Sequence, residues 1–297
     1  MPPLYPFLIR SVSSTFNLST LTAGILIGNL AYLLGLFAFY HYVLEETREE
    51  DVSRRALFYL ASFPTSFFFL AAYTEPVFLL FSGLTLLTFL KKRWVCSGIF
   101  GGAAALTRLT GTLLITPLAA AAFLTKQARA RWKPWLSVVG TALGSALFPL
   151  YLWLSVDKPP WAPLKMQTAR FHGGFSFPGM NVLHALEKVI RGQALIADYL
   201  DLAFILLFTL LIIPVVNSDL SLLSKVYYLS FLLLYLTREA GTQPLLGSTR
   251  YVLVFLPAFI VMAKAGRNPK VNRLVLYVSW PLQLFMAGQF VLWGWIG

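Results

Sequence analysis

Long apolar runs, separated by short charged or proline-containing segments, dominate the hydrophobic pattern of this chain. We delimit ten of them, at residues 18–42, 56–72, 76–90, 94–107, 109–125, 136–155, 200–216, 220–237, 250–264 and 273–296. A helix needs roughly 20 apolar residues to cross a bilayer, so the pattern predicts an all-α, polytopic transmembrane helical bundle of about ten spans. Several runs are shorter, which predicts a thinned bilayer or helices that end at a water-filled cavity.

Composition excludes an ordinary soluble domain. Of the 297 residues, 58% are hydrophobic and 12% are charged, whereas soluble chains contain about 25% charged residues. The 25 Phe, 13 Tyr and 8 Trp oppose disorder, and the lone Cys96 excludes a disulfide framework or a cysteine metal site. The net charge of +12 would favour nucleic acid in a soluble protein, but in a membrane protein it marks cytoplasmic loops. We therefore predict membrane lipid, and no nucleic acid, as a partner.

Basic residues predict the orientation of the spans. Most Lys and Arg fall in alternate short loops, around residues 48–55, 91–93, 126–133, 225 and 264–273, which the positive-inside rule assigns to the cytoplasm. The stretch 94–125 has basic flanks on both sides, so it is expected to be a hairpin with its outer tip at 106–111. The other face would carry Arg10 and a large outer loop at about 156–198. We expect residues 1–297 to form a single transmembrane domain.

Charged residues near membrane depth are the first candidates for function, because such charges are costly in lipid. Three groups lie at the predicted outer face. They are the turn containing Tyr73, Thr74 and Glu75, then Arg108 at the hairpin tip, and finally the segments containing Arg238, Arg250 and Tyr251. Each has a structural alternative: Glu75 as a helix cap, Arg108 as a snorkelling side chain, and Arg238 and Arg250 as helix-end anchors.

The convergence of these groups on one face favours a shared site. An outer cavity with two or three cations and one carboxylate suits a phosphate-bearing ligand together with acid–base chemistry. The three His residues, His41, His172 and His184, are too dispersed to predict a metal cluster. No cofactor is evident, and dependence on a divalent cation stays open.

Several short motifs at these positions resemble the PIG-V-type mannosyltransferases, a family of the polytopic GT-C glycosyltransferase class. They are Pro3-Leu4-Tyr5-Pro6 with Arg10, Phe63-Pro64-Thr65-Ser66-Phe67-Phe68 followed by Ala72-Tyr73-Thr74-Glu75, Leu106-Thr107-Arg108 with Thr110-Gly111, Arg250-Tyr251 with Pro257, and the Pro163–Pro178 segment. The resemblance spans nearly the whole chain, and its most specific part is the run from Phe63 to Glu75.

The resemblance implies a GT-C-like fold and sugar transfer from a polyprenyl-phosphate-linked donor to an acceptor on the outer face. With the grouping of charges at the outer face, it leads us to expect a catalytic role for Glu75, as an acid or as the group that positions the acceptor. We expect substrate binding by Tyr73, Thr74, Arg108, Arg250 and Tyr251, and by Arg238 from the grouping alone. Family members also use an Asp in a Trp-Asp motif shortly before the Pro-Leu-Tyr-Pro segment. This chain starts at that segment, so we expect it to lack the first span and that Asp, and its activity alone to be low.

Two other functions fit the same pattern. A transporter or flippase for a lipid-linked or anionic substrate would also place cations in an outer cavity, although we find no inverted repeat of the kind common in transporters. A catalytically inactive scaffold is the third alternative. The short loops favour a multi-pass protein of a prokaryotic plasma membrane, and the sugar, acceptor and lipid carrier stay open.

Overall fold

The computed structural model describes residues 2–124, 132–162, 165, 173–241 and 243–292 of the chain. The predicted outer-loop residues 163–164 and 166–172, His172 included, and the basic stretch 125–131 lie outside the described residues. The elements in order are α1 (Leu4–Phe16), α2 (Thr20–Thr47), α3 (Glu50–Ala61), η1 (Ser66–Phe69), α4 (Glu75–Leu90), α5 (Trp94–Thr107), η2 (Leu109–Leu114), α6 (Ile115–Leu124), α8 (Trp135–Ser155), β1 (Gly173–Phe175), α10 (Met180–Ile190), α11 (Ile196–Leu210), α12 (Ile212–Asn217), α13 (Leu222–Thr237), β2 (Arg238–Ala240), α14 (Ser248–Tyr251), η3 (Val252–Val254), α15 (Leu256–Ala265) and α16 (Pro269–Val291).

The fold is an all-α membrane bundle, and every predicted apolar run contains helix. In the described residues, four spans are long and apolar enough to cross a membrane: α2, α8, α11 with α12, and α16. A bent pair, Ser248–Val254 and Leu256–Ala265, makes a fifth if it counts as one span. The apolar helices α4, α5 and α13 and the combined segment Leu109–Leu124 are shorter, in agreement with the short spans that the sequence predicted.

Two predicted spans are broken where proline prevents a continuous helix. The run 56–72 is helical only to Ala61, after which Phe63-Pro64 interrupts it and a short 3-10 turn follows. The run 250–264 bends by 79° before Pro257, which lies in the first turn of α15, where a proline needs no N–H partner. Both breaks lie beside the candidate site.

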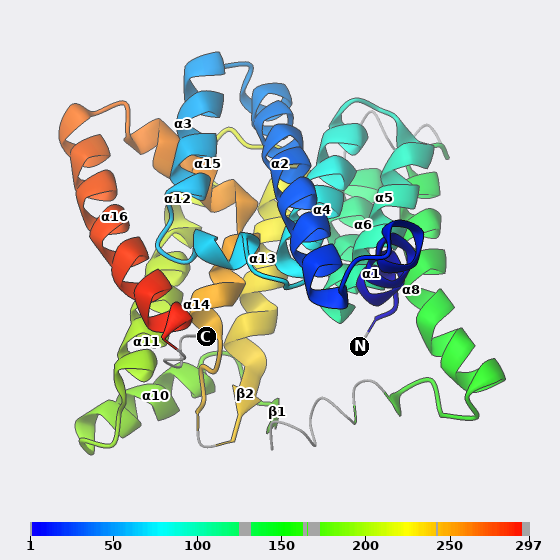
Figure 1. Ribbon diagram of the computed structural model, residues 1–297. Coiled ribbons are helices and arrows are strands. Elements are labelled where there is room, and N and C mark those ends of the chain that lie inside the picture. Colours follow the sequence, from blue (N-terminus) through cyan, green and yellow to red (C-terminus); the bar gives the residue numbers. More distant parts are fainter. Residues whose placement is uncertain (1, 125–131, 163–164, 166–172, 242, 293–297) are drawn as a thin grey trace.

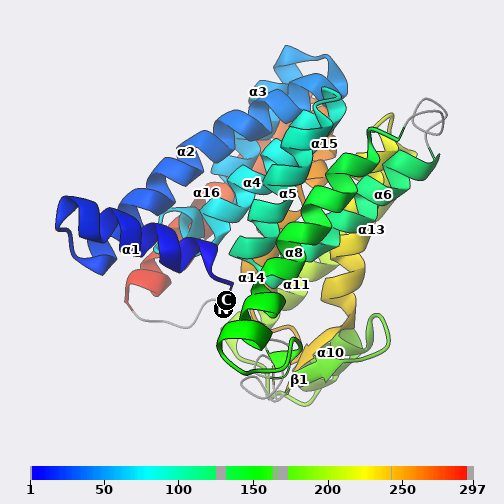
Figure 2. The same ribbon diagram turned by 90° about the vertical axis from the view of Figure 1, so that its right-hand side faces the viewer.

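Two helices were missed by the search for long apolar runs. The first, α1, crosses the end of α2 at an angle (Figure 2). The second, α10, lies within the predicted outer loop, whose β1 pairs antiparallel with β2. Both helices are amphipathic rather than uniformly apolar, so they contain no run long enough to be counted as a span.

The predicted hairpin at 94–125 is confirmed by its packing. After α5 ends, η2 turns back against it so closely that a Cβ on Gly111 would lie 2.5 Å from the backbone of Ala104. The same helix, α5, packs closely on α8 through glycines that lie four residues apart on each helix. A Cβ on Gly144 would lie 2.2 Å from the Cα of Gly102.

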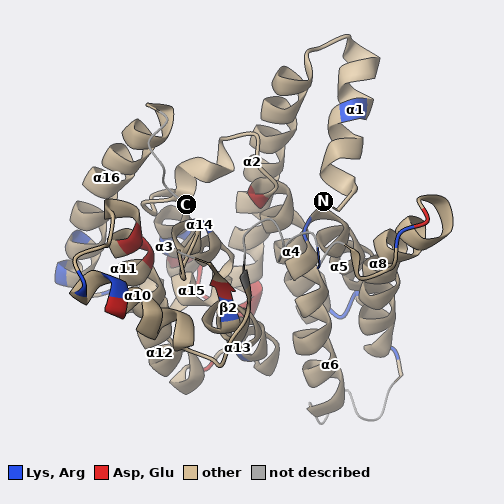
Figure 3. Cartoon of the chain, turned by 90° about the horizontal axis from the view of Figure 1, so that it is seen from below, with Lys and Arg blue, Asp and Glu red and all other residues tan. Residues whose placement is uncertain are grey.

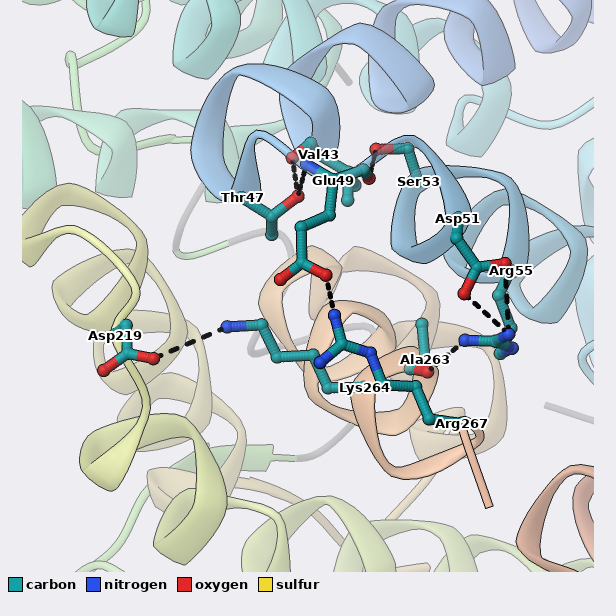
Figure 4. A network of polar contacts seen from close by, with 10 residues as sticks. All are labelled: Val43, Thr47, Glu49, Asp51, Ser53, Arg55, Asp219, Ala263, Lys264 and Arg267. Carbon is teal, nitrogen blue, oxygen red and sulfur yellow. Dashed lines mark hydrogen bonds and ion pairs between the residues drawn. The ribbon is translucent and has the colours of Figure 1, made fainter. Parts of the chain in front are cut away.

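The charged loops that were predicted to be cytoplasmic gather at one end of the bundle. The connections from α2 to α3, α4 to α5 and α15 to α16 lie together, while α10, β1 and β2 lie at the other end (Figure 1). At the charged end, Glu49 pairs with Arg267, and Arg55 donates to the Ala263 carbonyl at 3.1 Å and pairs with Asp51 at 2.9 Å (Figure 4). These contacts attach the end of α15 to the α2–α3 turn.

Candidate functional site

Glu75 begins α4 just after the break that follows η1. The turn closes through the Phe78 amide, which donates to the Thr74 carbonyl at 3.0 Å, and Pro76 occupies the first turn of the helix. The Glu75 side chain is 3% exposed. A carboxylate at a helix N-terminus is favoured by the helix dipole, but burial at this depth also demands cationic partners.

Arg108 supplies the first of these partners from the hairpin tip. It ends α5 in an extended conformation, with φ −143° and ψ 141°, and its carbonyl accepts the Gly111 amide at 2.8 Å. This turn directs the side chain to Glu75, so that Arg108 Nη1 lies 2.6 Å from Glu75 Oε1. The Arg108 side chain is 12% exposed, so it is largely buried with Glu75 as its partner.

Arg250 supplies the second partner from α14, the first part of the bent pair. Its Nε lies 3.0 Å from the same oxygen, Glu75 Oε1, and its Nη2 donates to the hydroxyl of Tyr251 at 3.2 Å. The approach of Arg108 Nη1 and Arg250 Nε is close enough for ion pairing, but neither buried nitrogen is aligned as a hydrogen-bond donor. Two guanidinium groups thus share one carboxylate, which leaves a positive charge of about one in a buried cluster.

Aromatic rings surround the guanidinium groups and keep them apart from lipid. The Tyr251 ring contacts three of them, with centroid distances of 5.5 Å to Arg108, 5.1 Å to Arg250 and 4.7 Å to Arg238. Tyr73 lies 5.3 Å from Arg250. Such cation–π contacts stabilise cations without neutralising them, so the excess positive charge is retained.

A small pocket, with room for about one water molecule, lies beside Tyr251. Its lining combines polar groups with an apolar wall: Tyr235, Arg238, Ala240, Pro244, Leu245, Leu246, Ser248 and Tyr251. Tyr235 stacks on Tyr251 at 5.0 Å, and its buried hydroxyl has no hydrogen-bond partner among the described residues. Seen from below, Lys, Arg, Asp and Glu occupy only a small part of the ribbon (Figure 3).

The structure brings all the predicted site residues into one region. Tyr73, Glu75, Arg108, Arg250 and Tyr251 make the contacts described above, and Arg238 lines the adjoining pocket. Thr74 is buried with its hydroxyl 3.4 Å from Glu75 Oε2. These positions leave the roles of the residues as predictions.

Sequence reasoning missed several contributors to the site. Phe78, whose ring lies 5.8 Å from the Arg108 guanidinium, is three positions after Glu75, so helical spacing was a usable signal. Tyr235 lies in an apolar run, and no pattern around it identifies it as a site residue. Asp201 and Asn181, which hold the backbone of site residues, are considered below. No group of three metal-ligating side chains occurs among the described residues.

Comparison with known proteins gives one informative likeness. The crystal structure of ArnT from Cupriavidus metallidurans bound to undecaprenyl phosphate matches with a TM-score of 0.58 and 16% sequence identity. The alignment covers 98% of this chain and 53% of that one. The fold is GT-C-like. This chain therefore spans about half the length of the ArnT chain, and the likeness at this identity concerns the fold. No family model and no curated protein matches the sequence.

Proposed function

We propose that this protein is a membrane glycosyltransferase that takes a sugar from a polyprenyl-phosphate donor at the outer face. The observation that carries the proposal is the buried cluster in which Arg108 and Arg250 share one oxygen of Glu75. The cluster holds more positive than negative charge, since two guanidinium groups face one carboxylate. A phosphate group supplies negative charge and accepts hydrogen bonds from guanidinium groups.

The same arrangement suits the chemistry of sugar transfer. When the bond between the sugar and the phosphate breaks, negative charge builds up on the leaving phosphate, and cations already fixed at that place stabilise the transition state. Arg108 and Arg250 are fixed by Glu75 and by the aromatic rings, so they need little reorganisation during the reaction. Arg238, Tyr235 and Tyr251 line the adjoining pocket, near which the sugar or its acceptor would lie.

A polyprenyl carrier is the phosphate source that best fits the surroundings of the site. The cluster lies at one end of a bundle of apolar helices, so a lipid chain attached to the bound phosphate would remain in the bilayer. The structural likeness supports this choice, because the matched ArnT structure is bound to undecaprenyl phosphate. We place the protein in a prokaryotic plasma membrane and treat residues 1–297 as one transferase-like domain.

Glu75 has two possible roles in this proposal. Its Oε1 is occupied by two guanidinium groups and its side chain is buried, so only Oε2, which lies 3.4 Å from the Thr74 hydroxyl, is left for an acceptor hydroxyl. This geometry favours Glu75 as the residue that positions the two arginines. A role as a catalytic acid or as the group that positions the acceptor is the alternative.

A mannosyl donor is the finer proposal, and it rests on the run from Phe63 to Glu75. Three residues of this run reach the cluster: the Phe68 ring lies 6.0 Å from the Arg250 guanidinium, Tyr73 lies on the same side chain, and Glu75 binds both arginines. The segment that resembles the mannosyltransferases most specifically is therefore also a segment that forms the site.

The test is sugar transfer by the purified chain in proteoliposomes. Polyprenyl-phosphate mannose, polyprenyl-phosphate glucose and polyprenyl-phosphate arabinose, each labelled in the sugar, are supplied with mixed membrane acceptors. Tighter binding or faster cleavage of the mannosyl donor than of the other two donors supports the proposal, and preference for another sugar corrects the donor only. Movement of an uncleaved donor across the bilayer would instead identify a flippase, and absence of both cleavage and donor binding would reject the site as a phosphate-sugar site.

A further inference from the structure

Arg238 and Arg250 lie on two separate short elements, which must be held in place for both guanidinium groups to keep their positions against the Tyr251 ring. Arg238 begins β2 at the end of α13, and Arg250 lies in the four-residue helix α14. Neither element is long enough to fix its own position. Two buried polar side chains, which come from the neighbouring helices α10 and α11, bind the backbone of these elements.

Asn181 holds the first element. Its side chain is fully buried, and its Nδ2 donates to two carbonyl oxygens at 2.7 Å each, those of Tyr235 and Arg238. Both acceptors belong to residues that line the pocket. The amide of Ser176 adds a further hydrogen bond to the Thr237 carbonyl at 2.8 Å. The end of α13 is thereby attached to the segment that leads into α10.

Asp201 holds the second element. Its side chain is 5% exposed although it lies on a membrane-spanning helix, and its Oδ1 accepts the backbone amide of Thr249 at 2.7 Å. Thr249 directly precedes Arg250, whose Nε reaches Glu75. A carboxylate in such surroundings is costly unless it is well bonded, and the bond it makes fixes the backbone next to a site cation.

The helices that carry these two side chains form one unit. Lys188 of α10 binds Asp198 of α11 at 2.8 Å, and Asp198 also accepts the amide of Leu195 at 2.8 Å in the turn between the helices. The corner between α10 and α11 is therefore closed by side chains of its own. Asn181 and Asp201 then extend from this unit to the two elements that carry Arg238 and Arg250.

We infer that Asn181 and Asp201 are positioning residues that set the separation of Arg238 and Arg250, so that the α10–α11 unit determines how well the cluster of Arg108, Arg250 and Glu75 binds a phosphate group. The phosphate part of this inference rests on the proposed function. The positioning part does not, because it concerns the backbone of the protein without ligand.

The chain provides a matched control for Asp201 at the opposite end of the bundle. Glu46 is also a carboxylate on a spanning helix, and it accepts the backbone amide of Ser221 at the start of α13. Glu46→Ala therefore removes the same kind of bond far from the site. For Asn181, the control is Ser137→Ala, since Ser137 is fully buried and donates to the Trp94 carbonyl at 2.9 Å.

The experiment combines hydrogen exchange of the free protein with binding of undecaprenyl phosphate in nanodiscs. Asp201→Ala is expected to speed amide exchange in residues 248–254 and to weaken binding at least tenfold. Asn181→Ala is expected to do the same for residues 235–240. Asp201→Asn, which keeps an acceptor oxygen, should stay within about threefold of the wild type in affinity. Both control variants should leave the exchange of these segments and the affinity unchanged.

Each failure has a separate reading. Unchanged exchange in residues 248–254 of Asp201→Ala, or equal weakening of binding by Glu46→Ala, would overturn the positioning role. If the wild-type protein does not bind undecaprenyl phosphate, the proposed function fails, and the exchange data alone decide on the positioning role. Should Asp201→Ala not fold, Asp201→Ser, whose shorter side chain does not reach the Thr249 amide, replaces it with the same criteria.

Discussion

Glu75 Oε1 and Arg108 Nη1 lie 2.6 Å apart in the interior of the bundle, one at the start of α4 and the other at the tip of the α5–α6 hairpin. Arg250 approaches the same oxygen from α14. The contact therefore joins three parts of the chain that are distant in sequence. It also concentrates two cations around one anion, which is an incomplete ion cluster until a second anion binds.

Loss of the Glu75 carboxylate should destabilise the protein strongly. Glu75→Ala leaves two buried guanidinium groups without their counter-ion, so we expect the free energy of unfolding to fall by about 3–5 kcal/mol. Denaturation in mixed micelles measures it. The control is Glu187→Ala, since Glu187 pairs with Arg191 on the surface, with both side chains more than half exposed, and should cost about 0–1 kcal/mol. Equal effects of the two variants would show that the buried pair contributes nothing particular.

The glycine contact between α5 and α8 should not tolerate a methyl group. In Gly144→Ala, the new Cβ would meet the Cα of Gly102 at 2.2 Å, and we expect a loss of stability of about 1–3 kcal/mol from overpacking. Gly288→Ala in α16 is the control, because open space surrounds the position that its methyl group would take. The melting temperatures of the two variants should differ by several degrees. Equal melting temperatures would show that α5 and α8 can move apart to accommodate the methyl group without loss of stability.

The orientation of the bundle is testable with single cysteines. In a Cys96→Ala background, cysteines at the exposed positions Lys92 and Asn268 should resist an impermeant thiol reagent added to intact cells. A cysteine at Gly241, exposed at the opposite end, should react. These expectations follow from the positive-inside rule. Labelling of Lys92→Cys from outside would reverse the orientation and place the arginine cluster at the cytoplasmic face.

Local sequence signals predicted the parts of the fold that local signals determine. The limits of α5 agree with the sequence because Lys91, Lys92 and Arg93 mark one end and Arg108 the other. The charged site residues were found because a charged side chain at membrane depth is costly and is therefore a candidate for function. By that same argument Asp201, which lies in an apolar run, should also have been noticed. The charge of Asp201 was a usable signal of function. Its partner Thr249 could not be predicted, because it is distant in sequence.

Other features depend on contacts that no local pattern records. The pairing of β1 with β2 joins Phe175 to Arg238 across a long stretch of chain, and neither three-residue segment has enough length to predict a strand. The bend in the ninth apolar run was hidden because the residues on both sides of Phe255 are apolar. Only Pro257 indicated the bend, and in the sequence this residue was interpreted only as part of the family resemblance.

The central claim is that the arginine cluster binds the phosphate of a polyprenyl lipid, and Arg108→Lys tests it most directly. Lys keeps the charge opposite Glu75 but loses the planar pair of donors that Arg offers to a phosphate. The control, Arg191→Lys, changes an arginine in an exposed pair.

The measurement is the dissociation constant for undecaprenyl phosphate in nanodiscs, with undecaprenol as the ligand that lacks phosphate. We predict binding at least tenfold weaker, about 1.4 kcal/mol, for Arg108→Lys, with little change in melting temperature and no change for Arg191→Lys. Equal affinity of Arg108→Lys and wild type, or equal binding of undecaprenol by the wild type, would contradict the account.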